Sequence, residues 1–306
     1  MSEIIPFPKL KQKLCSDIKN AIHQQQYEVA YDRFMDYEQH FEMSEELALM
    51  KCHVLWELKS YLELREEAHI LLEQGYEPQD ELMIFYVRSL YALGQYQSVV
   101  TVIEEILDNV NAHQTRMVLL PIKDQAQKML DDRRKEMHIQ LQQFTELLAG
   151  QQTELMLNMM DDSAYYFVDT IVYLLTDKQL KTSVQTLMLE YLRFARYNQN
   201  VQLELYGQKV DVVPEQLTGF ESSHFAEVIM PEVIAKLEET YPSLVQEAHH
   251  HLNAHNIAVY PIDITQLADD QTWMDSYFAY FEEMMGLAST TSKQDSIIEF
   301  IKLLNT

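Results

Sequence analysis

The feature of this sequence that most constrains its fold is a segment that recurs every 34 to 35 residues. Tyr27, Tyr61 and Tyr96 mark the same position in three successive segments, at spacings of 34 and 35 residues. Apolar residues precede and follow each tyrosine at the spacing that forms one face of a helix. The aligned positions include Ile18, Cys52 and Val87, then Ala30, Leu64 and Val99, then Phe34, Ala68 and Ile103. Each segment is therefore predicted to be two amphipathic helices joined by a tight turn.

The turn before the third tyrosine carries a family pattern. In LYALGQYQSVV, Gly94 and Tyr96 lie at the joint between the two predicted helices. Gln25 and Lys59 occupy the glycine position in the first two segments. Over about residues 10–110 the chain resembles the tetratricopeptide repeat, which has a period near 34 and a Gly-x-Tyr turn. It also resembles uncharacterised bacterial cytoplasmic proteins of this build. The resemblance implies a right-handed superhelix of α-helical hairpins.

Composition also favours a helical chain. Of the 306 residues, 47% are hydrophobic, and only 6 are Gly and 8 are Pro. This scarcity of turn-forming residues favours helices with short connections over a many-stranded β fold. The glycines are far apart, which excludes the glycine-rich loops that bind nucleotide phosphates. No GxSxG, HExxH or CxxC occurs, so the common hydrolase and zinc signatures are absent as well.

The chain is predicted to be all-α apart from one small β-hairpin. Residues 1–110 are predicted to form three tetratricopeptide-like hairpins, and residues 111–200 form further hairpins that resemble HEAT repeats. Residues 201–213 alternate between apolar and polar side chains, which is typical of a β-hairpin. Residues 214–306 are predicted to form a C-terminal helical region that packs on the solenoid. The predicted architecture is thus a right-handed α-α superhelix with a HEAT-like middle.

Residue pairing in the hairpin is predicted from its loop. A two-residue loop that begins at Gly207 suits a type II′ turn, which takes glycine at its first position. This loop places Leu205 opposite Val210 and makes one face of the hairpin apolar. It also sets Glu204 opposite Asp211, a like-charged pair with a small cost. An isolated hairpin is marginal in water, so this one is expected to lie on helices.

The net charge is strongly negative. There are 48 acidic and 23 basic residues, and the formal charge is -25. Such a field repels nucleic acid and anionic membranes and attracts basic proteins, although its role can also be solubility alone. No run of about 18 apolar residues could span a membrane, and the N-terminus lacks the apolar core of a signal peptide. With two cysteines and no disulfide framework, a cytoplasmic location is expected.

The resemblance also implies a binding face, because tetratricopeptide superhelices receive ligands on the concave side, along the first helix of each unit. The predicted lining residues are Lys19, Met50, His53, Trp56, Glu57, Phe85, Arg88 and Tyr91, with Leu49 and Ile84 beside them. Aromatic residues and arginine are frequent interface anchors. A clamp for chaperone carboxylates is not expected, since Lys19 and Arg88 stand alone. The alternative is that the aromatic residues are core, or are covered by the C-terminal half.

The segment EAHHHLNAH is the best metal candidate. On a helix, Glu247, His251 and His255 lie along one face at i, i+4 and i+8, and imidazoles at this spacing can share a metal. The alternative is a polar helix face that is rich in histidine, because no fourth ligand can be assigned. Cys15 and Cys52 fall within first helices and are interpreted as small packed hydrophobes.

The sequence predicts a non-catalytic scaffold, without a cofactor, that holds a peptide or protein on the concave face of the repeats. A basic partner fits the net charge, a homodimer is compatible with the sequence, and neither nucleic acid nor membrane is expected as a partner. The first alternative is an acidic regulator or decoy of a basic protein that handles nucleic acid. The second is a metal-dependent enzyme that uses Glu247, His251 and His255.

Overall fold

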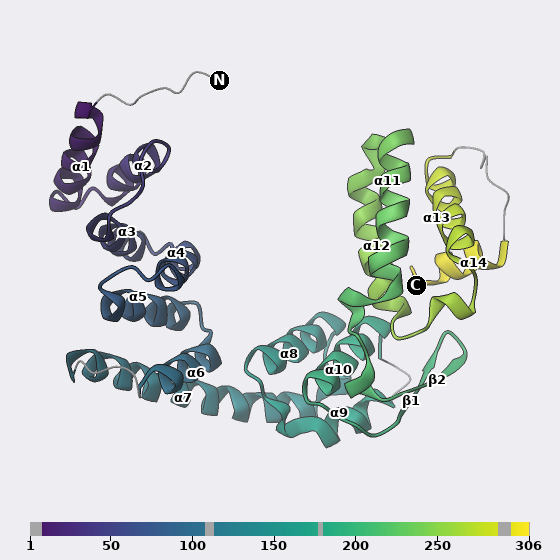
Figure 1. Ribbon diagram of the computed structural model, residues 1–306. Helices are drawn as coiled ribbons and strands as arrows, with labels where there is room; N and C mark the ends of the chain where they lie inside the picture. The colour runs from purple at the N-terminus through teal and green to yellow at the C-terminus, as the bar shows by residue number, and fades with distance from the viewer. Residues whose placement is uncertain (1–7, 108–112, 177–179, 287–294, 306) are drawn as a thin grey trace. The chain divides into compact units, whose positions relative to one another are not determined.

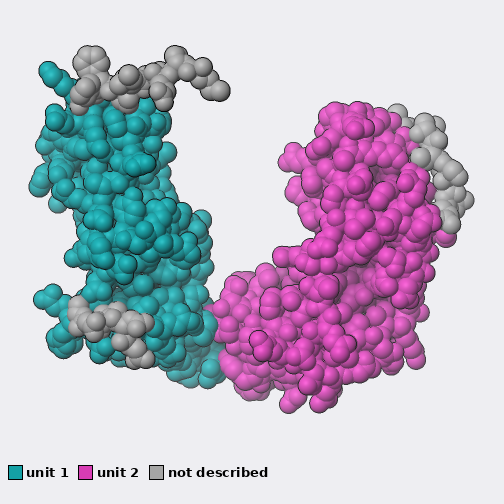
Figure 2. Space-filling view, in the orientation of Figure 1, with its two compact units in different colours: residues 1–135 teal, residues 136–306 magenta. Residues whose placement is uncertain are grey.

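The computed structural model describes residues 8–107, 113–176, 180–286 and 295–305. The chain divides into two compact units, Met1–Lys135 and Glu136–Thr306 (Figure 2), and each is described here by itself. Within the described residues there are fourteen α-helices and one two-stranded antiparallel sheet. This confirms the predicted all-α fold class with one small β-hairpin.

Unit 1 contains the three helical hairpins that the sequence period predicts (Figure 1). They are α1 (Pro8–His23) with α2 (Tyr27–Glu38), α3 (Glu45–Glu57) with α4 (Tyr61–Glu73), and α5 (Gln79–Ala92) with α6 (Tyr96–Leu107). The second helix of every pair begins at the aligned tyrosine. The period is therefore a structural repeat, and its second helix starts at the same place each time.

The three turns also share one backbone geometry. Gln25, Lys59 and Gly94 all have positive φ, of 56°, 58° and 72°. In each turn the next residue donates its N–H to a carbonyl five positions earlier, over 2.9 to 3.0 Å. This is the Schellman motif, in which a left-handed residue ends a helix. The glycine position of the repeat is thus a conformational position, which two non-glycine residues also occupy here.

The core of unit 1 follows the repeat. All nine aligned apolar residues named above, from Ile18 to Ile103, are fully buried. One buried charge joins three helices of this unit. The Lys51 ammonium on α3 lies 2.6 Å from the carboxylate of Glu38 on α2 and 2.8 Å from that of Glu67 on α4. The first two repeats are therefore held together by apolar packing and by an ion triad around the buried Lys51.

Helix α7 (His113–Gln142) follows the third hairpin and continues through Pro121. Its residues Leu119, Ala126 and Leu130 pack into the apolar cluster of α5 and α6. The first half of α7 thus covers the third hairpin, as the first helix of a further repeat would. The division of the chain at residues 110, 200 and 213 stays a prediction.

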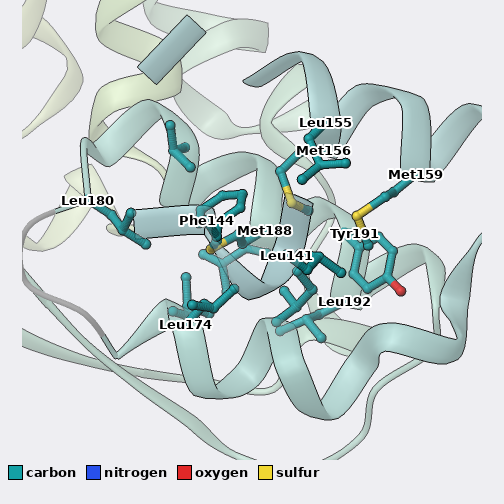
Figure 3. Packing of buried hydrophobic residues seen from close by; sticks show 14 of the residues in the cluster. Leu141, Phe144, Leu155, Met156, Met159, Leu174, Leu180, Met188, Tyr191 and Leu192 are labelled. Atoms are coloured by element: carbon teal, nitrogen blue, oxygen red, sulfur yellow. The ribbon is translucent and has the colours of Figure 1, made fainter. Parts of the chain in front are cut away.

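Unit 2 is built around two apolar clusters. The first gathers α8 (Ala149–Asp161), α9 (Val168–Leu175) and α10 (Thr182–Phe194) with the hairpin (Figure 3). Helix α10 is buried on several sides, as its apolar pattern predicts, through Val184, Met188, Leu189, Tyr191 and Leu192. The second cluster gathers α11 (Met230–Thr240), α12 (Val245–Val259), α13 (Asp270–Met284) and α14 (Asp295–Leu303). That residues 214–306 pack on the solenoid stays a prediction.

The hairpin lies on helices as expected, but its predicted register is wrong. Strands β1 (Val201–Leu205) and β2 (Gln208–Val212) pair Leu205 with Gln208 and Leu203 with Val210. The loop is Tyr206-Gly207, and both residues have positive φ, which is the type I′ geometry rather than type II′.

Tertiary contacts of Tyr206 explain the difference. Its hydroxyl donates to the carbonyl of Ala258 over 3.2 Å, and its ring meets Phe300 edge to face. These contacts hold Tyr206 at the left-handed loop position, and no local pattern reveals them. Glu204 then faces Lys209 instead of a like charge.

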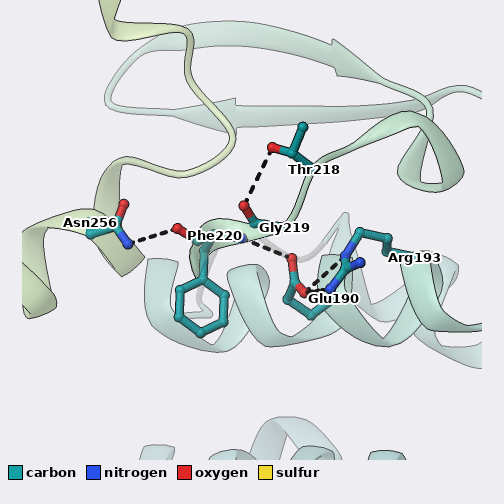
Figure 4. Close-up of polar contacts among 6 residues, drawn as sticks. All are labelled: Glu190, Arg193, Thr218, Gly219, Phe220 and Asn256. Atoms are coloured by element: carbon teal, nitrogen blue, oxygen red, sulfur yellow. Dashed lines mark hydrogen bonds and ion pairs between the residues drawn. The ribbon is translucent and has the colours of Figure 1, made fainter. Parts of the chain in front are cut away.

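A buried polar contact fastens the loop after the hairpin to α10 and α12 (Figure 4). The Glu190 carboxylate accepts the N–H of Phe220 over 3.3 Å and pairs with Arg193 at 2.6 Å. The Asn256 side-chain amide donates to the carbonyl of Phe220 over 2.9 Å. Gly219, with φ of 92°, lets the Arg193 guanidinium approach within 3.0 Å of where a Cβ would lie. The loop is thus held from two helices of unit 2.

Candidate interaction site

Three of the eight predicted lining residues meet at one pocket in unit 1. Trp56 near the end of α3 lies beside Arg88 and Tyr91 of α5, and Val118 and Ile122 of α7 complete the wall. The pocket has a volume of about 200 Å³. We call it the Trp56 pocket. Its walls come from α3 and α5, which are the first helices of the second and third hairpins, and from α7, which follows the third hairpin.

The repeat places the aromatic residues of this pocket. Trp56 and Tyr91 occupy the same position in two successive segments, five residues before the aligned tyrosine. Each packs on that tyrosine with its ring centroid 5.3 Å away, Trp56 on Tyr61 and Tyr91 on Tyr96. Stacked repeats therefore present equivalent aromatic pairs on neighbouring helices. Each pair closes its own turn and exposes part of one ring to the pocket.

Arg88 supplies the cation of the pocket. It lies one helical turn before Tyr91, and its guanidinium carbon is 5.9 Å from the centroid of the Trp56 ring, within the range of a cation–π interaction. No carboxylate among the described residues pairs with Arg88. The guanidinium thus keeps its hydrogen-bond donors for water or for a ligand.

Val118 and Ile122 were not predicted from the sequence. The period of the repeat cannot be followed beyond about residue 110, so α7 offered no aligned position. A usable signal exists, because Val118 and Ile122 are four residues apart and adjoin the buried stripe of Leu119, Ala126 and Leu130. Residues four apart share a helix face. Two neighbouring apolar stripes on one helix indicate two separate packing surfaces.

Two of the remaining predicted residues carry polar groups with partners of their own. Lys19 forms an ion pair with Glu46 at 2.8 Å, and this pairing raises the pKa of Lys19. His53 meets Tyr27 edge to face, with ring centroids 6.0 Å apart. Neither residue lines the Trp56 pocket. Lys19 is therefore paired with a carboxylate of its own chain.

The other three predicted residues lie at the same helices without lining the pocket. Met50 and Phe85 are half-buried and pack against the apolar clusters of unit 1. Glu57 is exposed at the end of α3. The structure therefore gathers Trp56, Arg88 and Tyr91 and leaves the five others around them.

The candidate metal residues have other partners. His255 is 1% exposed, with Nδ1 3.1 Å from the Tyr277 hydroxyl and Nε2 3.0 Å from the Asn305 side chain. Burial lowers the pKa of His255. His251 lies 3.3 Å from Glu247 on the same helix. Within the described ranges no group of three His, Cys, Asp or Glu residues is arranged to hold a metal. This arrangement gives the metal interpretation no support.

Neither Cys15 nor Cys52 forms a disulfide. Cys52 is fully buried, and burial raises the pKa of its thiol to about 12, so the thiol stays protonated. Cys15 is half-buried and free. In the described part of the chain, every helix is too short or too polar to cross a bilayer.

Comparison with known proteins gives one curated relative. The chain is 22% identical over 311 residues to the TPR repeat-containing protein YsoA of Bacillus subtilis (strain 168), with 98% of this chain and 92% of the relative covered. No family model matches. No solved structure matches either. Together with the three equivalent hairpins and their shared turn geometry, the match confirms that the chain is tetratricopeptide-like.

Proposed function

We propose that this tetratricopeptide-like protein is a non-catalytic scaffold that holds a segment of a partner protein over the Trp56 pocket. The observation that carries the proposal is the pocket itself, where Trp56, Tyr91 and an arginine without a carboxylate partner in the described residues face one space. Tryptophan, tyrosine and arginine dominate the binding energy of many interfaces. The name of the curated relative supports protein interaction at the level of the family.

The chemistry of the pocket indicates what it receives. Trp56, Tyr91 and Ile122 offer aromatic and aliphatic surface to an apolar side chain. Arg88 at the rim offers donors to a carbonyl or carboxylate of the same segment. We infer that the bound segment presents a large apolar residue next to a hydrogen-bond acceptor, and that the pocket lies on the concave side of the repeats.

A second function rests on the charge of unit 2. Residues 136–306 contain 25 acidic and 8 basic side chains, a balance of -17, while residues 1–135 carry the remaining -8. A surface of this kind attracts basic proteins over long range. The alternative proposal is therefore an acidic regulator of a basic protein, which would bind through unit 2.

Affinity capture from the native cell at low and high salt tests both proposals. The bait proteins are the wild type, Trp56→Ala and Arg88→Gln, with Tyr173→Ala and Arg196→Gln as matched controls at exposed positions of unit 2. Circular dichroism first verifies that each variant keeps its helix content. The scaffold proposal expects a partner that is lost with Trp56→Ala and Arg88→Gln and retained with both controls.

Capture at the two salt concentrations distinguishes the two proposed functions. Raising the salt from about 0.05 M to about 0.5 M screens exposed charges almost completely. Capture through the Trp56 pocket is expected to survive this change, because its apolar contacts are not screened. Capture that vanishes at high salt and ignores Trp56→Ala supports the acidic regulator. Partners that neither the variants nor salt affects would contradict both.

A further inference from the structure

A second pocket lies in unit 2, along the hairpin. It has a volume of about 540 Å³ and is lined on one side by the consecutive residues 200–204, which include most of β1. The opposite wall comes from α9 and α10 through Val172, Leu175, Leu180 and Gln185. We call it the β1-edge pocket. The lining of the pocket thus follows the strand over five consecutive residues.

The backbone of β1 is open on this side. In the described residues the sheet has two strands, so β1 pairs with β2 alone. Leu205 and Gln208 flank a two-residue loop and form a hydrogen-bonded pair, and hydrogen-bonded and non-hydrogen-bonded pairs then alternate along the ladder. Gln202 therefore falls at a non-hydrogen-bonded position opposite Asp211. Its N–H and C=O point away from β2, to the open edge of the strand.

Gln185 offers a polar group to the pocket. The residue is 6% exposed and lines the β1-edge pocket. No hydrogen bond to its amide group exists within the described part of the chain. Neither amide atom is among the fully buried atoms without a partner, so the amide is open to the pocket and to the group that fills it. An amide offers both donors and an acceptor, so its natural complement is a group with both, such as a peptide bond.

The remaining walls suit an extended chain. Val172, Leu175 and Leu203 form an apolar surface on which a side chain could be buried. Glu204 and Lys209 face each other across the hairpin and bring both signs of charge to the rim. Side chains of an extended peptide point alternately to opposite faces. One set would meet the apolar wall while the other meets the polar rim.

We propose that the β1-edge pocket binds an extended peptide, which adds to the open edge of β1 as a further strand. The peptide backbone pairs with the N–H and C=O of Gln202, and one of its peptide groups bonds to the Gln185 amide. Its apolar side chains, at alternate positions, pack on Val172 and Leu175. Strand addition of this kind takes affinity from main-chain hydrogen bonds and specificity from the alternate side chains.

Panning a phage library of short random linear peptides against the full-length protein tests the proposal. The wild type is expected to enrich peptides with apolar residues at alternate positions. The Gln185→Met variant keeps the length of the side chain and removes the amide, and it is expected to lose this enrichment. Gln216→Met, at an exposed position of the same unit, is the matched control and should behave as the wild type.

The most enriched peptide, made synthetically, gives the quantitative readout. Gln185→Met should weaken its binding by about tenfold, the effect of one lost pair of hydrogen bonds. Gln202→Pro removes the outward N–H, which an edge strand tolerates, and should weaken binding similarly, whereas Gln202→Ala should not. A peptide N-methylated at alternate amides should not bind. Trp56→Ala should leave binding unchanged, since the β1-edge pocket does not depend on the Trp56 pocket.

Thermal unfolding separates a lost ligand contact from a lost fold. Gln185→Met breaks no hydrogen bond within the described part of the chain, because the amide is open to the pocket, so its melting temperature is expected to equal that of the wild type. Lower binding at undiminished stability is a pattern that a merely structural glutamine would not give. No enrichment by the wild type overturns the proposal. Equal binding by Gln185→Met, by Gln202→Pro or of the N-methylated peptide overturns it as well.

Discussion

Lys59 and Gly94 adopt the same left-handed backbone conformation in equivalent turns, with φ of 58° and 72°. A residue with a Cβ is strained there, by about 1 kcal/mol, and glycine is not. Lys59→Gly is therefore expected to raise the free energy of unfolding by about 1 kcal/mol, as measured by urea denaturation. Lys59→Ala keeps the Cβ and serves as the control, with an expected change near zero. An equal gain from both substitutions would contradict the explanation.

The reverse substitution at the third turn is expected to destabilise. In Gly94→Ala the new Cβ would be strained by the positive φ and would lie 3.1 Å from the Arg133 guanidinium. We expect a loss of about 1 to 2 kcal/mol in the free energy of unfolding. Gly150→Ala is the control, because Gly150 lies in α8 with open space around it. Helical glycine to alanine should stabilise slightly. A loss at Gly150 as large as at Gly94 would refute the argument.

The ion triad around the buried Lys51 leads to a second kind of prediction. Glu38 and Glu67 bind the Lys51 ammonium from two different helices and raise its pKa, against the opposing effect of burial. Lys51→Met would leave two carboxylates facing each other with no cation. We expect a loss of about 2 kcal/mol in the free energy of unfolding, the contribution typical of hydrogen bonds to a charged group, because both carboxylates stay partly exposed to solvent. Chemical denaturation near neutral pH measures it.

The direction in which the stabilisation by Lys51 changes with pH follows from its raised pKa. Since the pKa of Lys51 is raised in the folded state, the stabilisation is fully present below its unfolded pKa of about 10.4 and fades only above it. Lys19→Met is the matched control, because its pair with Glu46 is exposed and solvent screening leaves such a pair with little effect on stability. Equal losses from Lys51→Met and Lys19→Met would contradict the role of burial.

His255 makes the stability of unit 2 sensitive to mild acid. Burial lowers its pKa below the unfolded value of about 6.5, so the unfolded chain binds more protons than the folded chain below that pH. Stability from this group is therefore lost as the pH falls through about 6.5. His255→Gln, which does not titrate, is expected to lose less stability than the wild type as the pH falls from about 7.5 to about 5.5.

Thermal unfolding at several pH values measures this difference. His249→Gln is the control, because His249 is exposed on the same helix. It controls for the loss of an imidazole from this helix. The Asn305 side chain bonds to His255, so a probe on the C-terminal helix should report the same acid transition. An unchanged pH dependence in His255→Gln would dismiss the effect.

The repeat made much of unit 1 predictable from the sequence. The aligned tyrosines start the second helices, the aligned apolar residues are buried, and the turn residues share one conformation. These features depend on local periodicity, which a sequence displays directly. The hairpin register was wrong because Tyr206 is held in its loop by Ala258 and Phe300, which are distant in the sequence.

The candidate sites were predictable only in part, for the same physical reason. Trp56, Arg88 and Tyr91 share a helix face of the repeat, so their proximity follows from the period. Ile122 enters the Trp56 pocket from α7, where no repeat position aligns. Gln185 looks like any glutamine on a helix, and only its position at the wall of the β1-edge pocket distinguishes it. Such a feature is a property of the packed molecule and leaves no mark on local sequence.

Tryptophan fluorescence can establish whether the Trp56 pocket is open in solution. The chain has two tryptophans, and they differ in environment: Trp273 is 0% exposed and donates to the carbonyl of Ile264, whereas Trp56 is half-buried at the pocket. In Trp273→Phe only Trp56 emits, and acrylamide is expected to quench it several-fold more efficiently than it quenches Trp273 in Trp56→Phe. If the C-terminal half or a second copy of the chain covered the pocket, both variants would be quenched weakly. Repeating the measurement over a range of protein concentrations distinguishes the C-terminal half from a second copy of the chain, because only a second copy would dissociate on dilution. Efficient quenching of Trp56 at all concentrations is the result that an open binding pocket requires, and a bound partner segment should then reduce it.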